Sequence, residues 1–269
     1  MRFFNRVGTN VLLSGDAGTN WSSIYTTINS ANLILKHTPE ISFTNEATRN
    51  EVMANAYFLR AYCYFTLVRV FGDCPLLTSG FESEKQEDMY PSRTAASEVY
   101  AQVETDIEEA LRLMPASSKL LHKASPAAIN MLRTEYYLWK AKRLGGGNAA
   151  LSTAQSSVDA VLKAGYALLP TFADIFNLNN EANSELIWTL PYIVNENVTP
   201  GTSPNFFAYY LAPNGDRTRL REAGYTEDEV PAGSHAQYVV PTQAYCDFLA
   251  EDARDTRTDV SVRVFEDKS

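Results

Sequence analysis

The residues best suited to chemistry lie between positions 195 and 240, where the sequence has little hydrophobic periodicity of either kind. Aromatic side chains alternate there with amides, a carboxylate and arginines, among them Asn205, Phe206, Phe207, Tyr209, Tyr210, Asn214, Asp216, Arg217 and Arg219. Aromatic faces pack against the C–H surface of a sugar ring, while polar side chains hydrogen-bond to its hydroxyl groups. This mixture favours capture of a glycan without cleavage of its bonds. The alternative is that the aromatic side chains only pin the loops to a scaffold.

Local signatures of the common enzyme sites are missing from the sequence. It contains no G-x-G-x-x-G, P-loop, G-x-S-x-G or H-E-x-x-H motif, and its histidines at 37, 122 and 235 are far apart. Asp106 and Glu109 would share a helix face, so an acidic glycoside hydrolase is a further hypothesis, but a solvated acidic face is the simpler interpretation. We predict a protein that is not an enzyme and that needs no cofactor or metal.

Charge and cysteine content exclude further classes of function. The chain has 269 residues with 23 Lys plus Arg against 32 Asp plus Glu, and its net charge of -9 argues against nucleic acid as a partner. Cys63, Cys74 and Cys246 have no C-x-x-C spacing, which indicates buried thiols rather than disulfides or a zinc site. No run of about 18 apolar residues is present, and the first residues are too polar for a secretory signal.

Five helices are expected to form the scaffold that positions these residues. Their hydrophobic stripes place them near 20–37, 46–71, 94–114, 125–144 and 148–164. We predict N-caps at Asn20, Ser125 and Asn148, whose side chains can accept hydrogen bonds from the first turn. The middle of the second helix is apolar nearly all round, with a narrow polar seam that includes Arg60, so neighbouring helices must cover it on several sides. A short strand is predicted over 185–192.

Two stretches of the helical region resemble each other. Two similar aromatic stretches, offset by 73 residues, each begin with a Leu-Arg pair, Leu59-Arg60 in the first and Leu132-Arg133 in the second. Half of that offset is close to the period of about 34 residues of tetratricopeptide hairpins. The Trp and Gly landmarks of that repeat are missing, so coincidence between two aromatic helices is the alternative. The sequence favours an all-α, tetratricopeptide-like helical repeat scaffold.

Two runs of residues are typical of a known family. They are Trp21-x-x-Ile24-Tyr25-x-x-Ile28-x-x-Ala31-Asn32 and Ala56-Tyr57-Phe58-Leu59-Arg60-Ala61-Tyr62-x-Tyr64-Phe65-x-Leu67-Val68-x-x-Phe71-Gly72-Asp73-x-Pro75-Leu76. Shorter matches follow in order at 97–100, 106–110, 165–168, 172–176, 184–188 and 241–242. Over nearly the whole chain, this pattern resembles the SusD/RagB family of nutrient-binding outer-membrane lipoproteins.

The resemblance implies a tetratricopeptide-like scaffold over 1–190 and a long, irregular ligand-binding lobe over 191–269, with little β structure. It implies binding of an oligosaccharide or another nutrient at the cell surface, and delivery to a SusC-like TonB-dependent transporter. It also implies a surface-exposed lipoprotein of the outer membrane, anchored by an N-terminal lipid that is absent from this chain. Members of the family are considerably longer, so we expect a C-terminal part to be missing as well.

Ligand residues in that family follow no strict motif. Their usual positions are before the Trp-x-x-Ile-Tyr helix and after the Glu-x-Ile-Trp segment, and the residues that we select at such positions are Asp16, Asn20, Trp21, Asn205, Phe206, Tyr209, Tyr210, Asn214 and Arg217. We expect these side chains to bind the ligand. The alternative function is that of a tetratricopeptide-type adaptor, which binds a partner protein through its concave helix face and binds no glycan.

Overall fold

The structure is a computed structural model that describes residues 19–83, 90–190, 221–222, 224, 226, 243–251, 254–255 and 257. These residues fall into two compact units. The first unit holds the described residues up to 168 together with 184–190, and the second holds 169–183 and the described residues from 221 onward. The division at residue 190 stays a prediction.

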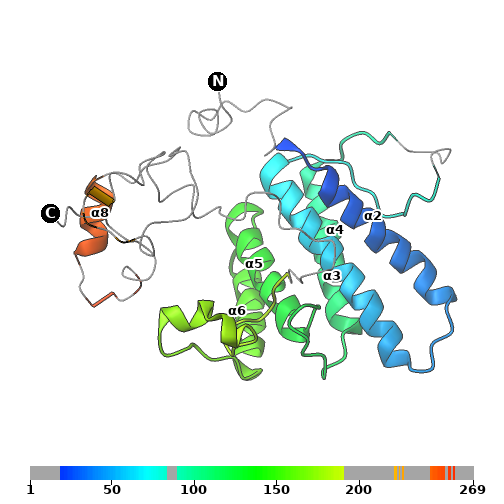
Figure 1. The fold of residues 1–269 in the computed structure, drawn as a ribbon. Helices are drawn as coiled ribbons and strands as arrows, with labels where there is room; N and C mark the ends of the chain where they lie inside the picture. Colours follow the sequence, from blue (N-terminus) through cyan, green and yellow to red (C-terminus); the bar gives the residue numbers. More distant parts are fainter. Residues whose placement is uncertain are drawn as a thin grey trace. The chain divides into compact units, whose positions relative to one another are not determined.

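The first unit is a layered array of α-helices (Figure 1). In chain order these are α2 (Ser22–His37), α3 (Glu46–Phe71), α4 (Ala96–Leu113), α5 (Pro126–Arg143) and α6 (Gly147–Lys163), with a 3-10 turn, η2 (Thr38–Glu40), after α2. Within the described residues there is no β-strand, and one isolated bridge joins Cys74 to Thr94. The predicted all-α class is confirmed, and all five helices lie within two residues of their predicted bounds.

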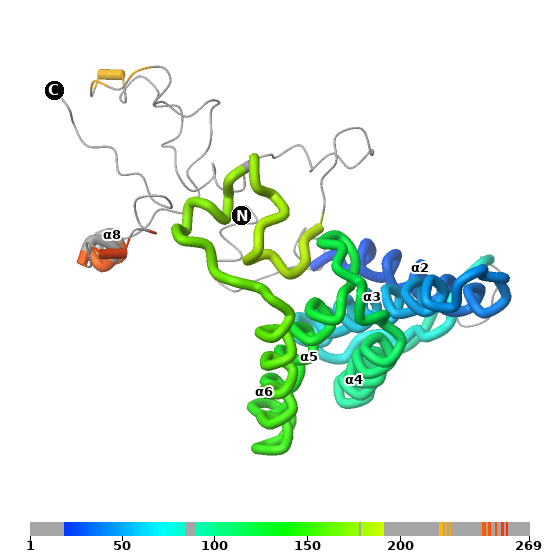
Figure 2. Tube along the Cα trace, turned by 90° about the horizontal axis from the view of Figure 1, so that it is seen from below, coloured from blue at the N-terminus to red at the C-terminus, as the bar shows by residue number. Residues whose placement is uncertain are grey.

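The long helix α3 lies in the middle of this unit. Asn45 caps its start by accepting a hydrogen bond from the Ala47 N–H at 2.8 Å, and Gly72, with a φ of 69°, closes its end. Helices α2 and α4 pack on either side of it, as Figures 1 and 2 show. This explains the nearly uniform apolar pattern of α3, because a helix that is covered on several sides keeps little polar surface.

The start of α4 is fixed by the loop that follows α3. Asp73 accepts a hydrogen bond from the Ala96 N–H at 2.8 Å, and Arg93 donates to the Asp73 carbonyl at 2.6 Å. Asp73 therefore caps a helix that has no capping side chain at its own N-cap, Ala95. The bridge between Cys74 and Thr94, with an N···O distance of 3.0 Å, holds the same turn closed.

The predicted N-caps have mixed outcomes. Ser125 caps α5, since its hydroxyl accepts from the Ala128 N–H at 3.1 Å. The prediction for Asn148 is wrong, because α6 begins at Gly147 and its N-cap is Gly146. Gly145, with a φ of 74°, turns the chain so tightly that the helix starts earlier than Asn148. Asn20 accepts from the Ser22 N–H at 2.9 Å, although Trp21 is the N-cap residue of α2.

Helices α3 and α5 run parallel to each other. Phe65 packs edge-to-face on Tyr136, with ring centroids 5.8 Å apart, and also contacts Trp139 one turn later at 6.5 Å. Nearer the helix starts, Phe58 shares a hollow with Leu132, and nearer the ends Arg69 shares another with Arg143. The two self-similar stretches found in the sequence thus lie in neighbouring parallel helices of a tetratricopeptide-like array.

The strand predicted over 185–192 is wrong for the described residues 185–190, which have no regular structure. A backbone hydrogen bond joins this segment to the loop before α5, from the Thr189 N–H to the Leu121 carbonyl at 3.0 Å. A strand needs a ladder of such bonds with a partner. The apolar residues Ile187 and Trp188 instead pack against the helical core.

The second unit contains the short 3-10 helices η3 (Phe172–Phe176) and η4 (Leu178–Asn180) and the helix α8 (Gln243–Ala250). Thr171 caps η3 by accepting from the Asp174 N–H at 3.3 Å. In the described part of the chain, no helix has the length and hydropathy that a membrane span requires.

Candidate ligand-binding site

An open hollow of about 510 Å³ lies beside the first two turns of α2. Helix α2 forms one wall, and the loop between α3 and α4 forms the other. The lining residues are Trp21, Ser22, Tyr25, Thr26, Asn29, Pro75, Leu77, Phe81 and Pro91. Aromatic rings and small hydroxyl and amide groups therefore meet at one place, which is the combination that the sequence suggested for a sugar.

Trp21 is a partly buried side chain at the edge of this hollow. Its ring packs edge-to-face on Tyr25 and Phe71, with centroids 5.8 and 5.1 Å away, and the Arg93 guanidinium lies 5.0 Å from its ring centroid. These contacts fix the orientation of the indole before any ligand arrives. A ring that is already held in place loses little conformational freedom when a sugar packs on it.

Polar side chains of α2 hold the loop wall of the hollow in place. Asn29 donates to the Phe81 carbonyl at 3.2 Å and accepts from its N–H at 2.7 Å, and the Tyr25 hydroxyl donates to the Pro75 carbonyl at 2.7 Å. Burial raises the pKa of Tyr25, which keeps this hydroxyl protonated and able to donate. At Gly80 a Cβ atom would lie 2.6 Å from the Leu33 side chain, so a larger residue would push the loop away from α2.

A buried network continues from this wall into the core. The Asn32 amide donates to the carbonyls of Leu77 and Ser79, at 2.9 and 3.2 Å, and its carbonyl oxygen accepts from Arg60 at 2.8 Å. Arg60 in turn donates twice to the Asp106 carboxylate, at 2.7 and 2.6 Å. Three helices and the loop are thus joined through side chains that are at most 5% exposed.

This network corrects two expectations from the sequence. Arg60 is not part of a polar seam, and Asp106 is not on a solvated acidic face but fully buried. Asp106 lies three residues after Val103 and four before Ala110, which puts it on the apolar stripe of α4. A carboxylate on such a stripe, with one arginine in the middle of a buried helix, is the signal that would have predicted the ion pair. Burial raises the pKa of Asp106 against the opposing effect of Arg60.

The hollow beside Trp21 has the chemistry of a binding site. Among the described residues that line it, none is acidic, basic or a histidine. It therefore offers packing surfaces and hydrogen-bonding groups but no described general acid or base. In the described part of the chain, no group of three or more His, Cys, Asp or Glu side chains is placed to hold a metal ion.

Two of the nine candidate ligand residues from the sequence can be located. Trp21 lines the hollow, and the exposed Asn20 directly precedes it. The remaining candidates lie outside the described residues: Asp16, Asn205, Phe206, Tyr209, Tyr210, Asn214 and Arg217. Sequence reasoning missed Asn29 and Phe81, because neither is marked by a motif and the loop reaches α2 only in the folded structure.

Comparison with known proteins places this geometry in a family. Residues 5–137 match the model of a SusD-like family described as "Starch-binding associating with outer membrane". The SusD-like protein P38 of Formosa agariphila is 31% identical over 214 residues, which cover 72% of this chain and 39% of that protein. The chain spans 31 to 41% of the length of the curated relatives that it matches.

Two solved structures share the fold at similar identity. Bacteroides fragilis NanU superposes with a TM-score of 0.65 at 29% identity, covering 72% of this chain and 39% of its own. A SusD superfamily protein from Bacteroides vulgatus superposes with a TM-score of 0.62 at 32% identity, covering 69% of this chain and 38% of its own.

The comparisons thus place the described helical scaffold in a class of proteins described as starch-binding and associated with the outer membrane. The comparisons point to no enzyme family. The chain belongs to the SusD/RagB family. The expected family and the fold class are confirmed.

Proposed function

We propose that this protein binds an oligosaccharide, or another nutrient, at the cell surface and delivers it to a SusC-like TonB-dependent transporter. The observation that carries this proposal is the match to a starch-binding family on residues that build the described scaffold. The residues typical of the family have physical roles here: Asn32 and Arg60 hold the loop wall, and Trp21 lines the hollow.

The hollow beside Trp21 is proposed as part of the glycan site. Its aromatic rings suit the C–H face of a sugar, and Ser22 and Thr26 offer hydroxyl groups to the sugar hydroxyls. From their types and positions in the sequence, we also propose as ligand-binding residues Asp16, Asn20, Asn205, Phe206, Tyr209, Tyr210, Asn214 and Arg217, of which all but Asn20 lie outside the described residues.

Binding without cleavage is part of the proposal. A glycoside hydrolase places two carboxyl groups on either side of the scissile bond. Asp106, which suggested such a pair in the sequence, is occupied by Arg60 inside the core and has no contact with solvent. We further propose that an N-terminal lipid anchors the protein at the outer surface of the outer membrane.

Native gel electrophoresis through embedded polysaccharides tests glycan binding. The panel includes soluble starch, a neutral β-glucan and an acidic polysaccharide, with bovine serum albumin as the non-binding reference. We expect retardation in one class of polysaccharide and no release of reducing ends after prolonged incubation. Equal mobility in every gel contradicts glycan binding, and release of reducing ends contradicts the non-catalytic role.

Delivery to a transporter needs a separate test. Affinity purification from the native outer membrane, solubilised in mild detergent, is expected to co-purify a TonB-dependent transporter in a fixed ratio. Recovery of the protein without any transporter contradicts the delivery step. Glycan binding is then judged from the gel experiment alone.

A further inference from the structure

A groove runs along the seam between the parallel helices α3 and α5, on residues that the glycan site does not use. Its first half is a hollow of about 300 Å³ lined by Phe58, Tyr62, Ala128, Met131, Leu132, Glu135, Glu185, Leu186, Ile187 and Trp188. Its second half is a hollow of about 470 Å³ lined by Arg69, Glu135, Leu138, Trp139, Lys142 and Arg143. Glu135 lines both hollows, so they adjoin.

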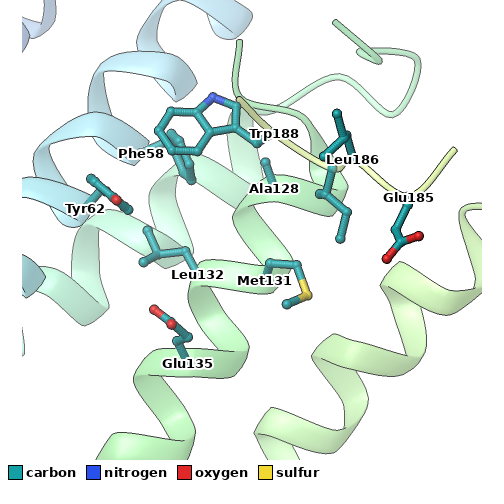
Figure 3. Close-up of a pocket in the computed structure, with 10 residues that line it drawn as sticks. Phe58, Tyr62, Ala128, Met131, Leu132, Glu135, Glu185, Leu186 and Trp188 are labelled. Carbon is teal, nitrogen blue, oxygen red and sulfur yellow. The ribbon is translucent and has the colours of Figure 1, made fainter. Parts of the chain in front are cut away.

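The first half is apolar and aromatic, as Figure 3 shows. Trp188 packs edge-to-face on Phe58 and Tyr62, with ring centroids 5.2 and 5.4 Å apart. Tyr62 remains 40% exposed, although its chain neighbours Ala61 and Cys63 are buried. The hollow therefore offers fixed rings and the side chains of Met131 and Leu132 to an apolar group.

The second half carries positive charge in a chain of net charge -9. Lys142 and Arg143 are exposed and form no ion pair with any described residue, and the Arg143 guanidinium lies 5.6 Å from the centroid of the Trp139 ring. Arg69 lies over the Phe65 ring at 4.0 Å, and its nearest acid, Glu135, is 3.9 Å away. The C-terminal end of α5 accounts for about half a negative charge. The cations at this end therefore exceed the nearby negative charge.

We infer that this groove binds a peptide segment of a partner protein, with apolar side chains at one end and carboxylates at the other. The apolar end lies against Trp188 and Tyr62, and the carboxylates lie against Lys142, Arg143 and Arg69. Charge complementarity favours an acidic over a basic partner. The peptide residue that lies opposite Glu135 is neutral or basic, because a carboxylate on the peptide at that position would be repelled by the Glu135 carboxylate.

The parallel helices also set the length of the segment. Phe58 and Arg69 are eleven residues apart on α3, as are Leu132 and Arg143 on α5. At a rise of 1.5 Å per residue, the two ends of the groove are about 16 Å apart. An extended peptide covers that distance in about five residues. The apolar and acidic side chains of the partner are therefore separated by about five positions.

Selection from a random dodecapeptide display library against the whole chain tests this inference. We expect enriched peptides to combine aromatic or aliphatic residues with Asp or Glu about five positions away. A synthetic, fluorescein-labelled version of one enriched peptide is then titrated by anisotropy. The affinity is expected to fall when NaCl is raised from 0.1 to 1 M, as the screening length falls from about 10 to about 3 Å.

Matched variants separate charge pairing from general electrostatics. Lys142→Glu with Arg143→Glu is expected to weaken the peptide at least tenfold, whereas Lys119→Glu with Lys163→Glu, which makes the same change in net charge at exposed sites elsewhere, leaves the affinity unchanged. Tyr62→Ala is expected to weaken the peptide while the salt dependence stays the same. Thermal unfolding checks that each variant is folded.

Three results overturn the inference: no enrichment of any peptide, enrichment of peptides without acidic residues, or equal affinity for wild type and the Lys142→Glu, Arg143→Glu variant.

Discussion

The Arg60 guanidinium donates two hydrogen bonds to the Asp106 carboxylate, at 2.7 and 2.6 Å, where Asp106 has no exposed surface. Gln102 donates a third bond to the same carboxylate at 2.8 Å, and Asn32 accepts from Arg60 at 2.8 Å. Both charges are thus fully paired inside the core. A buried ion pair contributes little net stability compared with two apolar side chains of similar volume. Replacing only one of the two charged residues is costly, because it leaves the other charge buried without a partner.

Arg60→Met is expected to destabilise the protein by about 3–5 kcal/mol at pH 7, because it leaves the Asp106 carboxylate buried without its cation. Arg60→Met combined with Asp106→Leu is expected to recover a large part of the loss. Urea unfolding followed by circular dichroism measures both. Arg112→Met, which removes an exposed partner of Glu109, is the control and is expected to leave the free energy of unfolding nearly unchanged.

The destabilisation caused by Arg60→Met is also expected to depend on pH, in a direction that the burial of Asp106 determines. Without Arg60, burial is opposed only by the weaker effect of the Gln102 hydrogen bond, so the pKa of Asp106 in the folded state rises further above the unfolded value. A raised pKa means that protonation favours the folded state, so the loss caused by Arg60→Met is expected to be smaller at pH 4 than at pH 7. A loss that is equal or larger at pH 4 would contradict the assignment of a buried, unpaired carboxylate.

Glu104 joins α4 to α5 by accepting from the Tyr136 and Tyr137 hydroxyls at 2.8 and 2.9 Å and from Lys140 at 2.7 Å. Burial alone would raise the pKa of Glu104, but the hydrogen bonds from Lys140 and the tyrosines outweigh it and lower the pKa. Glu104→Gln is expected to cost about 1–2 kcal/mol at pH 7.

That cost has a defined pH dependence. The stabilisation by Glu104 is present above the ordinary glutamate value of 4.5 and is lost as the pH falls through the lowered folded value. The difference in free energy of unfolding between wild type and Glu104→Gln therefore shrinks between pH 5 and pH 3. The more exposed Glu135, 3.9 Å from Arg69, is the control, and Glu135→Gln is expected to cost less stability at pH 7 than Glu104→Gln.

His37 contacts Glu82 at 2.5 Å and Glu40 at 3.2 Å through its two ring nitrogens. The hydrogen bond to Glu82, followed by that to Glu40, raises the pKa of His37 above 6.5. The contribution of the pair to stability is therefore present below pH 6.5 and is lost as the pH rises through the higher folded value. An NMR titration is expected to show a lower His37 pKa in Glu82→Gln and a smaller decrease in Glu40→Gln. An unchanged midpoint in Glu82→Gln would show that the contact is absent in solution.

Burial raises the pKa of the Cys63 thiol to about 11 and raises that of Cys74 as well. At pH 8 a thiol with that pKa is ionised in about one molecule in a thousand, and the thiolate is the reactive form. In a Cys246→Ser background, Ellman's reagent is expected to detect no thiol in the folded protein and two after unfolding. Rapid reaction of either thiol under native conditions would contradict their burial.

The helices were predictable because their signals are local. Hydrophobic stripes and the predicted cap at Ser125 indicated their bounds, since each depends on residues within a few positions. The failure at Asn148 arose from a local competition, in which three consecutive glycines allowed α6 to begin earlier. The expected strand failed because a strand depends on a distant partner, and residues 185–190 have none in the described part of the chain.

The candidate site was predictable only in part. Trp21 was selected because it stands at a position typical of the family, and the structure places it beside a hollow. Asn29 and Phe81 are 52 residues apart in sequence, and nothing in either local pattern indicates that they form one wall. Asp106 was assigned to the wrong surface because its acidic neighbours Glu108 and Glu109 are partly exposed, whereas it lies on the buried stripe of α4 with Val103, Ile107 and Ala110.

Glycan binding at the hollow beside Trp21 is the central claim, and calorimetric titration with the polysaccharide that retards the protein most strongly tests it. Trp188 is the matched control, because it is also a tryptophan packed against the same helical core but does not line that hollow. We predict that Trp21→Ala weakens glycan binding at least tenfold, about 1.4 kcal/mol, while Trp188→Ala leaves it within twofold of wild type. Equal affinities for wild type and Trp21→Ala, with the variant folded, would contradict the claim.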